Sequence, residues 1–413
     1  MEIRQLYITS LLILFSLLLL ACGQENKPKA GLSKTAKSDT TVIHIPLELA
    51  SDVTYSLSDL VQITRVVRLE SHAETILGDA SAVYQLPNGH WLTADKRSAQ
   101  IKVFDSTGRF MYPIGAVGKG PGEWLSLNVV DYDSVTGRLM TLSNQDMRVN
   151  LYQTDGPWVR DMLLPFAAQH LIMLPDNQWA ALTGFNVSDI SGNFHLLLAD
   201  KQMEISNRYL GFGPKKKNSM RGVGFLRRTT DGCLIQVPFG DTIFHWQPGT
   251  LTPRYAMDFG DRAIPKDRRG DLSYMMGNPD FIDMARQMGQ AWETDRYLVF
   301  GTTWDRRHRV RVWDRQQQRL WGYEQCDAPL AARNLFRPVG ITPKGEWIVP
   351  LLPTQVHPEW NKPGSYTAEA ATQTRAYLQA HYPEVFAQLA DWQEDDNYAL
   401  LCVRFALPSA PAD

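Results

Sequence analysis

The chain has 413 residues, 44% of them hydrophobic and 10% aromatic, and a formal net charge of −2. That charge argues against a general nucleic-acid-binding protein, because phosphate recognition needs a marked basic excess or a basic stripe. The spacing of His and Cys in the folded part matches no zinc pattern, so we expect neither a metal site nor a cofactor. The 29 Gly and 24 Pro suit a folded protein with many turns.

The N-terminus has the features of an export signal. Arg4 precedes an apolar run over residues 11–20, and the sequence Leu-Leu-Ala before Cys22 resembles a bacterial lipobox. The run is too short for a transmembrane helix of about 20 residues. We expect residues 1–21 to be a lipoprotein signal peptide and Cys22 to carry the lipid anchor; an uncleaved anchor, or cleavage elsewhere, is the alternative. Gly23 rather than Asp follows the cysteine, which favours the outer membrane of the cell envelope and leaves the leaflet open.

A flexible tether is predicted next, over residues 22–41, which are rich in Lys, Ser and Thr and almost free of large apolar side chains. The folded body is expected over residues 42–413. Its first clear strand, residues 61–69, partly alternates apolar and polar side chains and has no partner nearby in sequence. An unpartnered first strand of this kind can close a ring of sheets.

The most regular stretch of the body lies between residues 79 and 115. Four short strands fit there, because Pro87-Asn88-Gly89 predicts a turn between the first two and residues 105–108, Asp-Ser-Thr-Gly, predict a turn between the last two. The strand over residues 101–104 is Ile-Lys-Val-Phe, which alternates like a half-buried strand. One antiparallel four-stranded sheet of this size is typical of a propeller blade.

Five looser passages of the same kind follow. They cover residues 128–164, 170–210, 224–259, 291–323 and 339–405. The last contains an Ala-rich stretch with helical spacing at about residues 367–389, which leaves its blade one strand short. If residues 61–69 supply that strand, the ring closes and its open sheet edges disappear. The sequence therefore predicts an all-β, six-bladed β-propeller closed by an N-terminal strand, with a small helical insertion in the last blade.

Three phrases of the sequence resemble one family. They are the Ile-Lys-Val-Phe-Asp strand followed by Gly-Lys-Gly-Pro-Gly-Glu at 118–123, a mid-chain phrase at residues 237–244 with Asp-Phe-Gly at 258–260, and Glu-Asp-Asp-Asn at 394–397. In them the chain resembles the six-bladed β-propeller lipoproteins of Bacteroidetes, a family similar in pattern to NHL-repeat propellers. The resemblance implies the architecture and the cell-envelope location, and it implies no biochemical activity.

Strand order sorts the candidate binding residues onto one face of such a propeller. Turns between first and second and between third and fourth strands lie on one face, and the remaining loops lie on the other. The second face collects the longer loops, which is where binding sites usually lie on a rigid scaffold. The candidate ligand-binding residues on that face are Asp95, Lys96, Arg97, Lys119, Glu123, Trp124, Asp146, Asp241, Arg306 and Arg307.

Each of these candidates also has a structural interpretation. The glycine loop at 118–123 has backbone N–H groups that can hold an anion, but it lacks the Lys-Ser/Thr ending of a P-loop, and a blade-to-blade turn is the simpler interpretation. Asp95 and Asp241 follow second strands, where an aspartate commonly caps a loop. The arginines, together with the lysines at 215–217, form either an anion-binding face or a solvated surface. Trp124 either stacks on a sugar or packs in the core.

Three functions remain open on these grounds. The leading hypothesis is a cell-envelope binding module that recognises a glycan, a peptide or an envelope protein through the face with the longer loops. A hydrolase or lyase acting on a carbohydrate or another small molecule would instead need carboxylates or histidines to converge at the channel mouth. A structural or sensory component of an envelope complex would need an exposed apolar patch.

Overall fold

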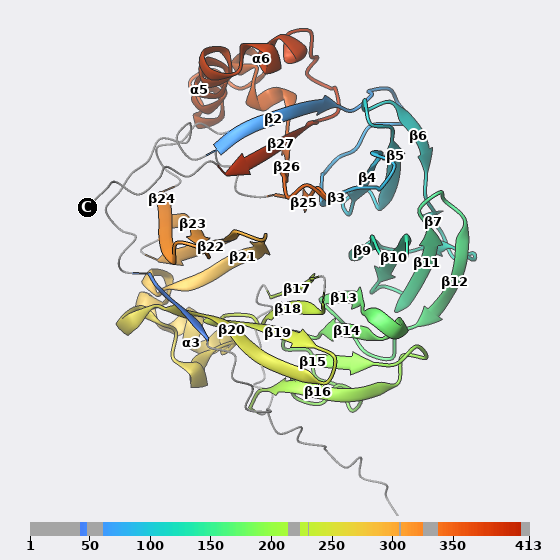
Figure 1. Cartoon of the computed structure of the whole chain (residues 1–413), viewed down its shortest axis with the longest axis vertical. Coiled ribbons are helices and arrows are strands. Elements are labelled where there is room, and N and C mark those ends of the chain that lie inside the picture. Colours follow the sequence, from blue (N-terminus) through green and yellow to red (C-terminus); the bar gives the residue numbers. More distant parts are fainter. Residues whose placement is uncertain are drawn as a thin grey trace, which may run out of the picture. The chain divides into compact units, whose positions relative to one another are not determined.

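The computed structural model describes residues 42–47, 61–213, 224–229, 231–304, 307–324 and 338–405. The signal peptide, the Cys22 anchor and the tether predicted from the sequence lie outside these residues. In the described part, six antiparallel sheets are arranged radially around a central axis (Figure 1). The prediction of a six-bladed β-propeller is confirmed.

The first three blades each contain four strands that are consecutive in the chain, with the first strand nearest the axis. Blade 1 consists of β3 (Ala82–Gln85), β4 (Trp91–Asp95), β5 (Gln100–Phe104) and β6 (Phe110–Pro113). Blade 2 consists of β9 (Val129–Asp133), β10 (Arg138–Ser143), β11 (Arg148–Gln153) and β12 (Trp158–Leu163). Blade 3 consists of β13 (His170–Met173), β14 (Trp179–Leu182), β15 (Phe194–Ala199) and β16 (Ile205–Gly211), with a short 3₁₀ helix, η2 (Pro175–Asn177), in its first turn.

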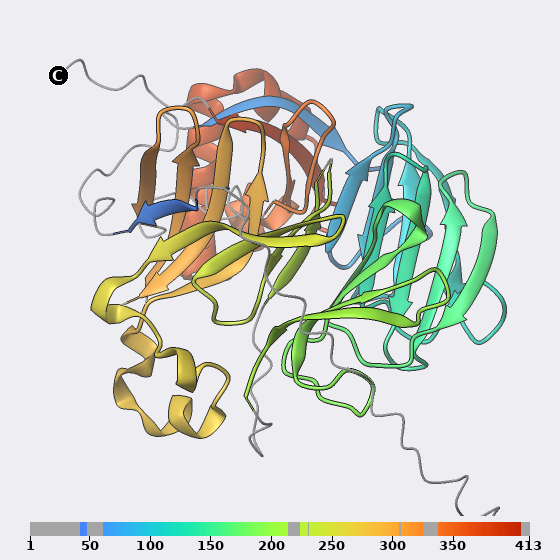
Figure 2. The ribbon, with the colours of Figure 1, turned by 60° about the horizontal axis from the view of Figure 1, so that its bottom comes forward.

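Blades 4 and 5 follow the same order. Blade 4 consists of β17 (Phe225–Arg228), β18 (Cys233–Gln236), β19 (Thr242–Gln247) and β20 (Thr250–Asp258). Blade 5 consists of β21 (Arg286–Glu293), β22 (Tyr297–Trp304), β23 (Arg307–Asp314) and β24 (Arg319–Glu324). The segment between the two blades folds into η3 (Gly260–Arg262), η4 (Lys266–Arg268), α3 (Leu272–Gly277) and η5 (Pro279–Asp283), and Figure 2 shows it projecting from one side of the ring.

Blade 6 joins the two ends of the described chain. It consists of β25 (Gly340–Ile341), β26 (Trp347–Leu351), β27 (Ala399–Phe405) and the early strand β2 (Val61–Arg68), which pairs antiparallel with β27 from Val61↔Phe405 to Arg68↔Ala399. The ring closure predicted for residues 61–69 is confirmed. Gly108 of blade 1 shows how closely the next blade approaches, because a Cβ atom there would lie 1.8 Å from the carbonyl oxygen of Arg68.

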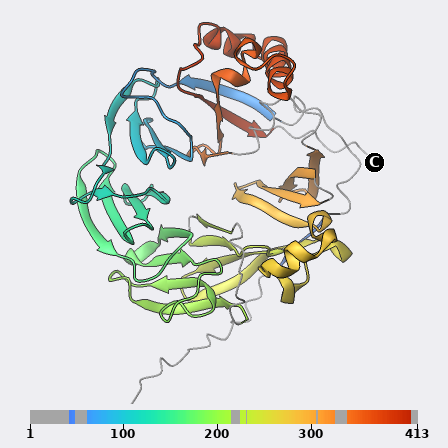
Figure 3. The same ribbon diagram turned by 180° about the vertical axis from the view of Figure 1, so that it is seen from behind.

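The helical insertion covers the outer side of blade 6 (Figures 1 and 3). It contains η7 (Pro353–Gln355), η8 (Pro358–Trp360), α5 (Tyr366–His381) and α6 (Pro383–Leu389), so the prediction of helix at 367–389 is confirmed. The Ser365 hydroxyl caps α5 by accepting from the Ala368 N–H at 3.2 Å. Tyr382, between the helices, donates its hydroxyl to the Val61 carbonyl at 3.2 Å and accepts from the Ile63 N–H at 3.3 Å. These two bonds give partners to one carbonyl and one N–H at the beginning of β2.

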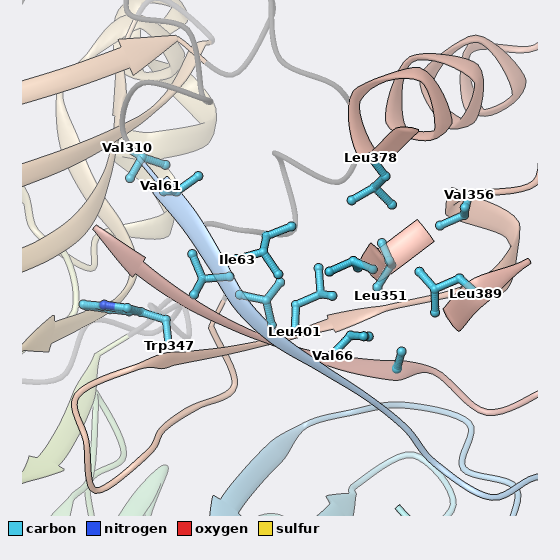
Figure 4. Close-up of a cluster of buried hydrophobic side chains, with 14 of the residues drawn as sticks. Val61, Ile63, Val66, Val310, Trp347, Leu351, Val356, Leu378, Leu389 and Leu401 are labelled. Carbon is cyan, nitrogen blue, oxygen red and sulfur yellow. The ribbon is translucent and has the colours of Figure 1, made fainter. Parts of the chain in front are cut away.

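Packing between blades holds the ring together. In the described residues, six clusters of buried hydrophobic side chains lie between neighbouring blades, because each radial sheet buries both of its faces. Figure 4 shows the cluster of blade 6, in which Leu378 and Leu389 of the insertion pack with Leu351, Leu401 and Ile63. A fully buried aliphatic side chain of this kind contributes about 1.5–3 kcal/mol.

Two small elements were not predicted. β1 (Ile43–Pro46) adds a fifth, parallel strand to the outer edge of blade 4, with Ile43 opposite Tyr255 and Pro46 opposite Asp258. Strands β7 (Ala116–Val117) and β8 (Glu123–Trp124) form a short parallel pair beside blade 1. A four-residue strand whose partner lies more than two hundred residues away carries no turn signal, so its pattern alone gives no indication of the pairing.

Candidate ligand-binding site

The antiparallel order of the strands gives the ring two different faces. The tight-turn face carries the turns between first and second and between third and fourth strands of the blades, such as residues 86–90 and 105–109 of blade 1. The loop-rich face carries the loops between second and third strands and the blade-to-blade connections, including the segment at 260–285. The nine candidate binding residues that the structure describes belong to loops or strand ends of the loop-rich face, and their environments there differ.

Asp95 has a structural role in this fold. The carboxylate is fully buried at the end of β4 and accepts hydrogen bonds from the N–H groups of Gly78, Arg97 and Ser98 at 2.6, 2.9 and 3.0 Å, and from the Ser98 hydroxyl. Burial alone would raise the pKa of Asp95, but these hydrogen bonds outweigh burial and hold the pKa below its ordinary value. The side chain caps its own loop, as expected for the structural interpretation, while Arg97 is exposed and Lys96 is partly buried.

The glycine loop that follows blade 1 is filled by the side chain of Glu123, a residue of the same loop. The Glu123 carboxylate accepts from the Gly120 N–H at 2.7 Å, so it lies where an anion held by this loop would have to lie. Trp124 is fully buried, donates from its indole nitrogen to the Ala99 carbonyl at 2.9 Å and packs edge-on against Tyr152. Lys119 is exposed at the tip. This arrangement is that of a blade-to-blade turn.

The remaining candidates are scattered around the face. Asp146 accepts from the Ser143 hydroxyl and lies 3.5 Å from the Arg148 guanidinium within its own turn. Arg306 and the lysines at 215–217 lie outside the described residues, and Arg307 is described only as the first residue of β23. Of the predicted residues whose side chains the structure describes, Asp241 lies on the wall of a large pocket.

That pocket opens on the loop-rich face between blades 3 and 4 and has a volume of about 750 Å³. Three loops form its walls: the end of β16 with residues 211–213, the β18–β19 loop at residues 237–241, and residues 266–270 of the segment between blades 4 and 5. Phe185 and His195 of blade 3 and Thr242 and Phe244 of β19 also line it. We call this the inter-blade pocket.

Aromatic rings form one side of the inter-blade pocket. Phe185 lies 4.9 Å from His195, 5.4 Å from Phe212 and 6.5 Å from Phe239, measured between ring centroids. Gly270 makes room for this cluster, because a Cβ atom there would lie 2.4 Å from the Phe185 ring and its φ is +74°. Phe239 itself has a φ of +60°, a conformation that costs a non-glycine residue about 1–2 kcal/mol.

His195 presents a hydrogen-bond acceptor to the pocket. Its Nδ1 lies 2.6 Å from the Gly184 carbonyl oxygen, and because a carbonyl only accepts, Nδ1 carries the proton and Nε2 keeps a lone pair. Burial lowers the pKa of His195 to about 4, so the ring is neutral at physiological pH. Within the described part of the chain no group hydrogen-bonds to Nε2.

An ion pair forms the polar side of the pocket. The Arg269 guanidinium donates to Asp241 Oδ2 at 2.6 Å, and the Thr242 hydroxyl donates to Asp241 Oδ1 at 2.9 Å. Burial acts to raise the pKa of Asp241, but the hydrogen bond and charge of Arg269, the Thr242 hydrogen bond and the charge of Lys266 together outweigh it and lower the pKa. Lys266 adds an exposed cation at the rim. The pocket thus combines aromatic rings, a neutral imidazole, two carboxylates (Asp241 and Asp267) and two cations.

Sequence reasoning missed most of this pocket. Phe185, Phe212 and Arg269 lie on three loops whose sequences carry no shared motif, and the pocket exists because two blades and the 260–285 segment meet there. The available signal was the length of that segment on the loop-rich face. Among the described residues there is no group of three or more His, Cys, Asp or Glu that could hold a metal ion. No helix in the same residues has the length and apolar character needed to cross a membrane.

Comparison with known proteins identifies a family and similar solved structures. The model of a family described as "Domain of unknown function (DUF4934)" matches residues 40–404. A candidate exported protein from Bacteroides fragilis is similar in structure, with 17% identity and a TM-score of 0.67 over 88% of this chain and 99% of that one. A member of the DUF4221 family from Bacteroides vulgatus has 8% identity and a TM-score of 0.52 over 85% of this chain and all of the other. No curated protein matches the sequence. At these identities the structural likenesses show the fold alone.

Proposed function

The chain belongs to the DUF4934 family, and we propose that it acts as a binding module of the cell envelope. In this proposal its ligand is held in the inter-blade pocket. The lipid anchor at Cys22 and the outer-membrane location, both predicted from the sequence, are parts of this proposal. The lipoprotein character and the similarity to NHL repeats remain predictions.

The observation that carries the proposal is the pairing of an aromatic wall with a polar wall in one pocket of about 750 Å³. Pockets of a few hundred cubic ångströms, mostly apolar with a few directed polar groups, are typical ligand sites. A sugar ring fits this division, because its C–H face packs on aromatic rings such as Phe212 while its hydroxyls both donate and accept hydrogen bonds. His195 Nε2 and the Asp241 carboxylate accept, and Arg269 and Lys266 donate. The ligand class that we propose is therefore a saccharide.

The electrostatics support binding more than catalysis. Asp241 is ionised and its oxygens are held by Arg269 and Thr242, so it serves as a fixed acceptor and not as a proton donor. A hydrolase or lyase is the alternative function. If a bound saccharide is recovered unchanged after long incubation with the protein, the result supports a binding module; if it is cleaved, the result supports the enzyme. A peptide or an envelope protein as the ligand is the other outcome that the same binding experiment reveals.

The test uses the full chain in detergent, screened against host and bacterial oligosaccharides and followed by calorimetry on those that bind. Phe212→Ala removes the aromatic face and Asp241→Asn removes the charged acceptor, and each is expected to weaken binding at least about tenfold, or 1.4 kcal/mol. Asp105→Asn, on the tight-turn face, is the matched control and should leave affinity unchanged. If no saccharide binds below about 1 mM, or if all three variants behave alike, the proposal fails.

A further inference from the structure

His195 lies among the aromatic rings of the inter-blade pocket. The centroid of its ring is 4.9 Å from that of Phe185, at an interplanar angle of 78°, and 4.4 Å from that of Phe212, at 37°. Only 6% of the residue is exposed, and the residue forms part of the pocket wall. The imidazole is therefore a polar group set into the apolar side of the pocket.

One ring nitrogen of His195 has a partner and the other does not. The Nδ1–H donates to the Gly184 carbonyl at 2.6 Å, which fixes the tautomer in which Nε2 is an acceptor. Burial keeps the ring uncharged, and no residue of the described chain donates to Nε2. An acceptor held among hydrocarbon groups gains more from a hydrogen bond than one in open water. A ligand group with a single donor hydrogen is therefore favoured at this position.

The donors of the pocket lie on the segment between blades 4 and 5. The Arg269 guanidinium uses one terminal nitrogen on Asp241 and its Nε on the Ile264 carbonyl at 3.4 Å, which leaves its other terminal nitrogen without a partner among the described residues. This segment packs directly against the aromatic rings, since a Cβ atom at Gly270 would lie 2.4 Å from the Phe185 ring. The pocket thus offers a neutral acceptor among its aromatic rings and cationic donors on its polar side.

Among the polar groups that saccharides carry, the acetamido group matches both sides. A hydroxyl that donates to Nε2 leaves its own lone pairs against aromatic carbon, and an ammonium leaves N–H donors unpaired there. A carboxylate has no hydrogen to donate. A secondary amide has one N–H, and its carbonyl points in the opposite direction because the amide is planar and trans. Its methyl group is apolar and suits an aromatic wall.

We infer that the saccharide held in the inter-blade pocket carries an N-acetyl group. The amide N–H donates to His195 Nε2, the methyl group packs on Phe185, and the carbonyl accepts from Arg269 or Lys266. This inference rests on the proposed saccharide-binding function and adds the residue that selects the ligand. Phe212 packs on any sugar ring, whereas His195 discriminates between an acetamido sugar and its hydroxyl analogue.

The first test compares matched saccharides by calorimetry on the full chain in detergent. N-acetyllactosamine is paired with lactose, and triacetylchitotriose with cellotriose, because the members of each pair differ in acetamido against hydroxyl groups. We expect the N-acetylated member of a pair to bind at least about tenfold more tightly, since its analogue lacks the amide hydrogen bond and the methyl contact. Chitotriose, which carries free amines, should bind no better than cellotriose.

The outcomes separate this inference from the proposed function. A saccharide without an acetamido group that binds as tightly as the best N-acetylated one, in these pairs or in the wider screen, would overturn the inference and leave saccharide binding intact. If no saccharide binds, both fail. An N-acetylated peptide that binds while the saccharides do not would assign the same amide contacts to a peptide and would also overturn the inference.

Substitution of His195 tests the hydrogen bond itself. In His195→Asn the side-chain nitrogen takes the position of Nδ1 and still donates to Gly184, but no atom replaces Nε2, so the preference for the acetamido sugar should fall below about twofold. His195→Gln places an amide oxygen near the position of Nε2 and should keep part of the preference. His72→Asn, the same change at a histidine outside the pocket with a side chain 45% exposed, should keep all of it. The preference is a ratio measured within each variant, so reduced stability alone does not change it. An unchanged preference in His195→Asn would refute the role of Nε2.

Discussion

Asn397 connects the two ends of the folded chain, and its replacement by alanine is expected to weaken ring closure. The side chain is 2% exposed and makes three hydrogen bonds to the segment that follows β2. Its amide donates to the carbonyls of Glu70 at 2.7 Å and Thr75 at 3.0 Å, and its oxygen accepts from the Leu77 N–H at 2.8 Å. Each bond contributes about 1 kcal/mol net, and buried groups left without partners cost about 1–3 kcal/mol each. We expect Asn397→Ala to lower the free energy of unfolding by about 3–5 kcal/mol.

Urea unfolding followed by tryptophan fluorescence measures this loss as a shift of the transition midpoint. Asn397→Asp keeps an acceptor for Leu77 but places a carboxylate against two carbonyl oxygens, so it should be at least as destabilising at neutral pH. Asn361→Ala is the comparison, because Asn361 donates to two carbonyls inside the helical insertion and only there. A loss below about 1 kcal/mol for Asn397→Ala, or one no larger than that of Asn361→Ala, would refute the closure argument.

Three further outcomes are expected from the same unfolding measurement. Asp95→Asn should lower the free energy of unfolding by about 1–3 kcal/mol at pH 7. Hydrogen bonds outweigh burial and lower the pKa of Asp95, so the stability difference between the parent chain and the variant should disappear as the pH falls from about 5 to 3. A difference that does not change with pH would contradict the capping role of the Asp95 carboxylate. Arg228→Gln leaves Asp131 buried without its cation and should lower the free energy of unfolding by about 3–5 kcal/mol. Adding Asp131→Asn should restore part of this loss, and a double variant no more stable than Arg228→Gln would argue against the ion pair. Gly270→Ala should cost about 1–2 kcal/mol and also weaken saccharide binding by displacing Phe185, whereas unchanged binding would remove that ring from the site.

Much of the fold follows from local sequence patterns. Alternating side chains and turn residues such as Asn88-Gly89 specify strands and hairpins over a few residues, and the same antiparallel order then fixes which loops share a face. The early strand β2 was also predictable, because a blade with three strands requires a fourth. The helical insertion was visible from its spacing of alanines and apolar residues.

The position of β1 was decided by tertiary structure. Its four residues pair with β20, a partner that no hairpin connects to it, so the pairing depends on an edge that exists only after blade 4 has formed. The inter-blade pocket has the same origin, since Phe185, Phe212 and Arg269 meet only when blades 3 and 4 pack.

The two adjacent arginines of β17 show most clearly what the sequence alone does not determine. By itself, the sequence places Arg227 and Arg228 on opposite sides of one strand, because side chains alternate along a β-strand. Ring closure decides what each side meets: the carboxylates of blade 2 for Arg228, and the indole ring of Trp292 for Arg227. Local chemistry therefore determines the blades and their two faces, while the contacts between blades determine which charges meet a carboxylate and which meet an aromatic ring.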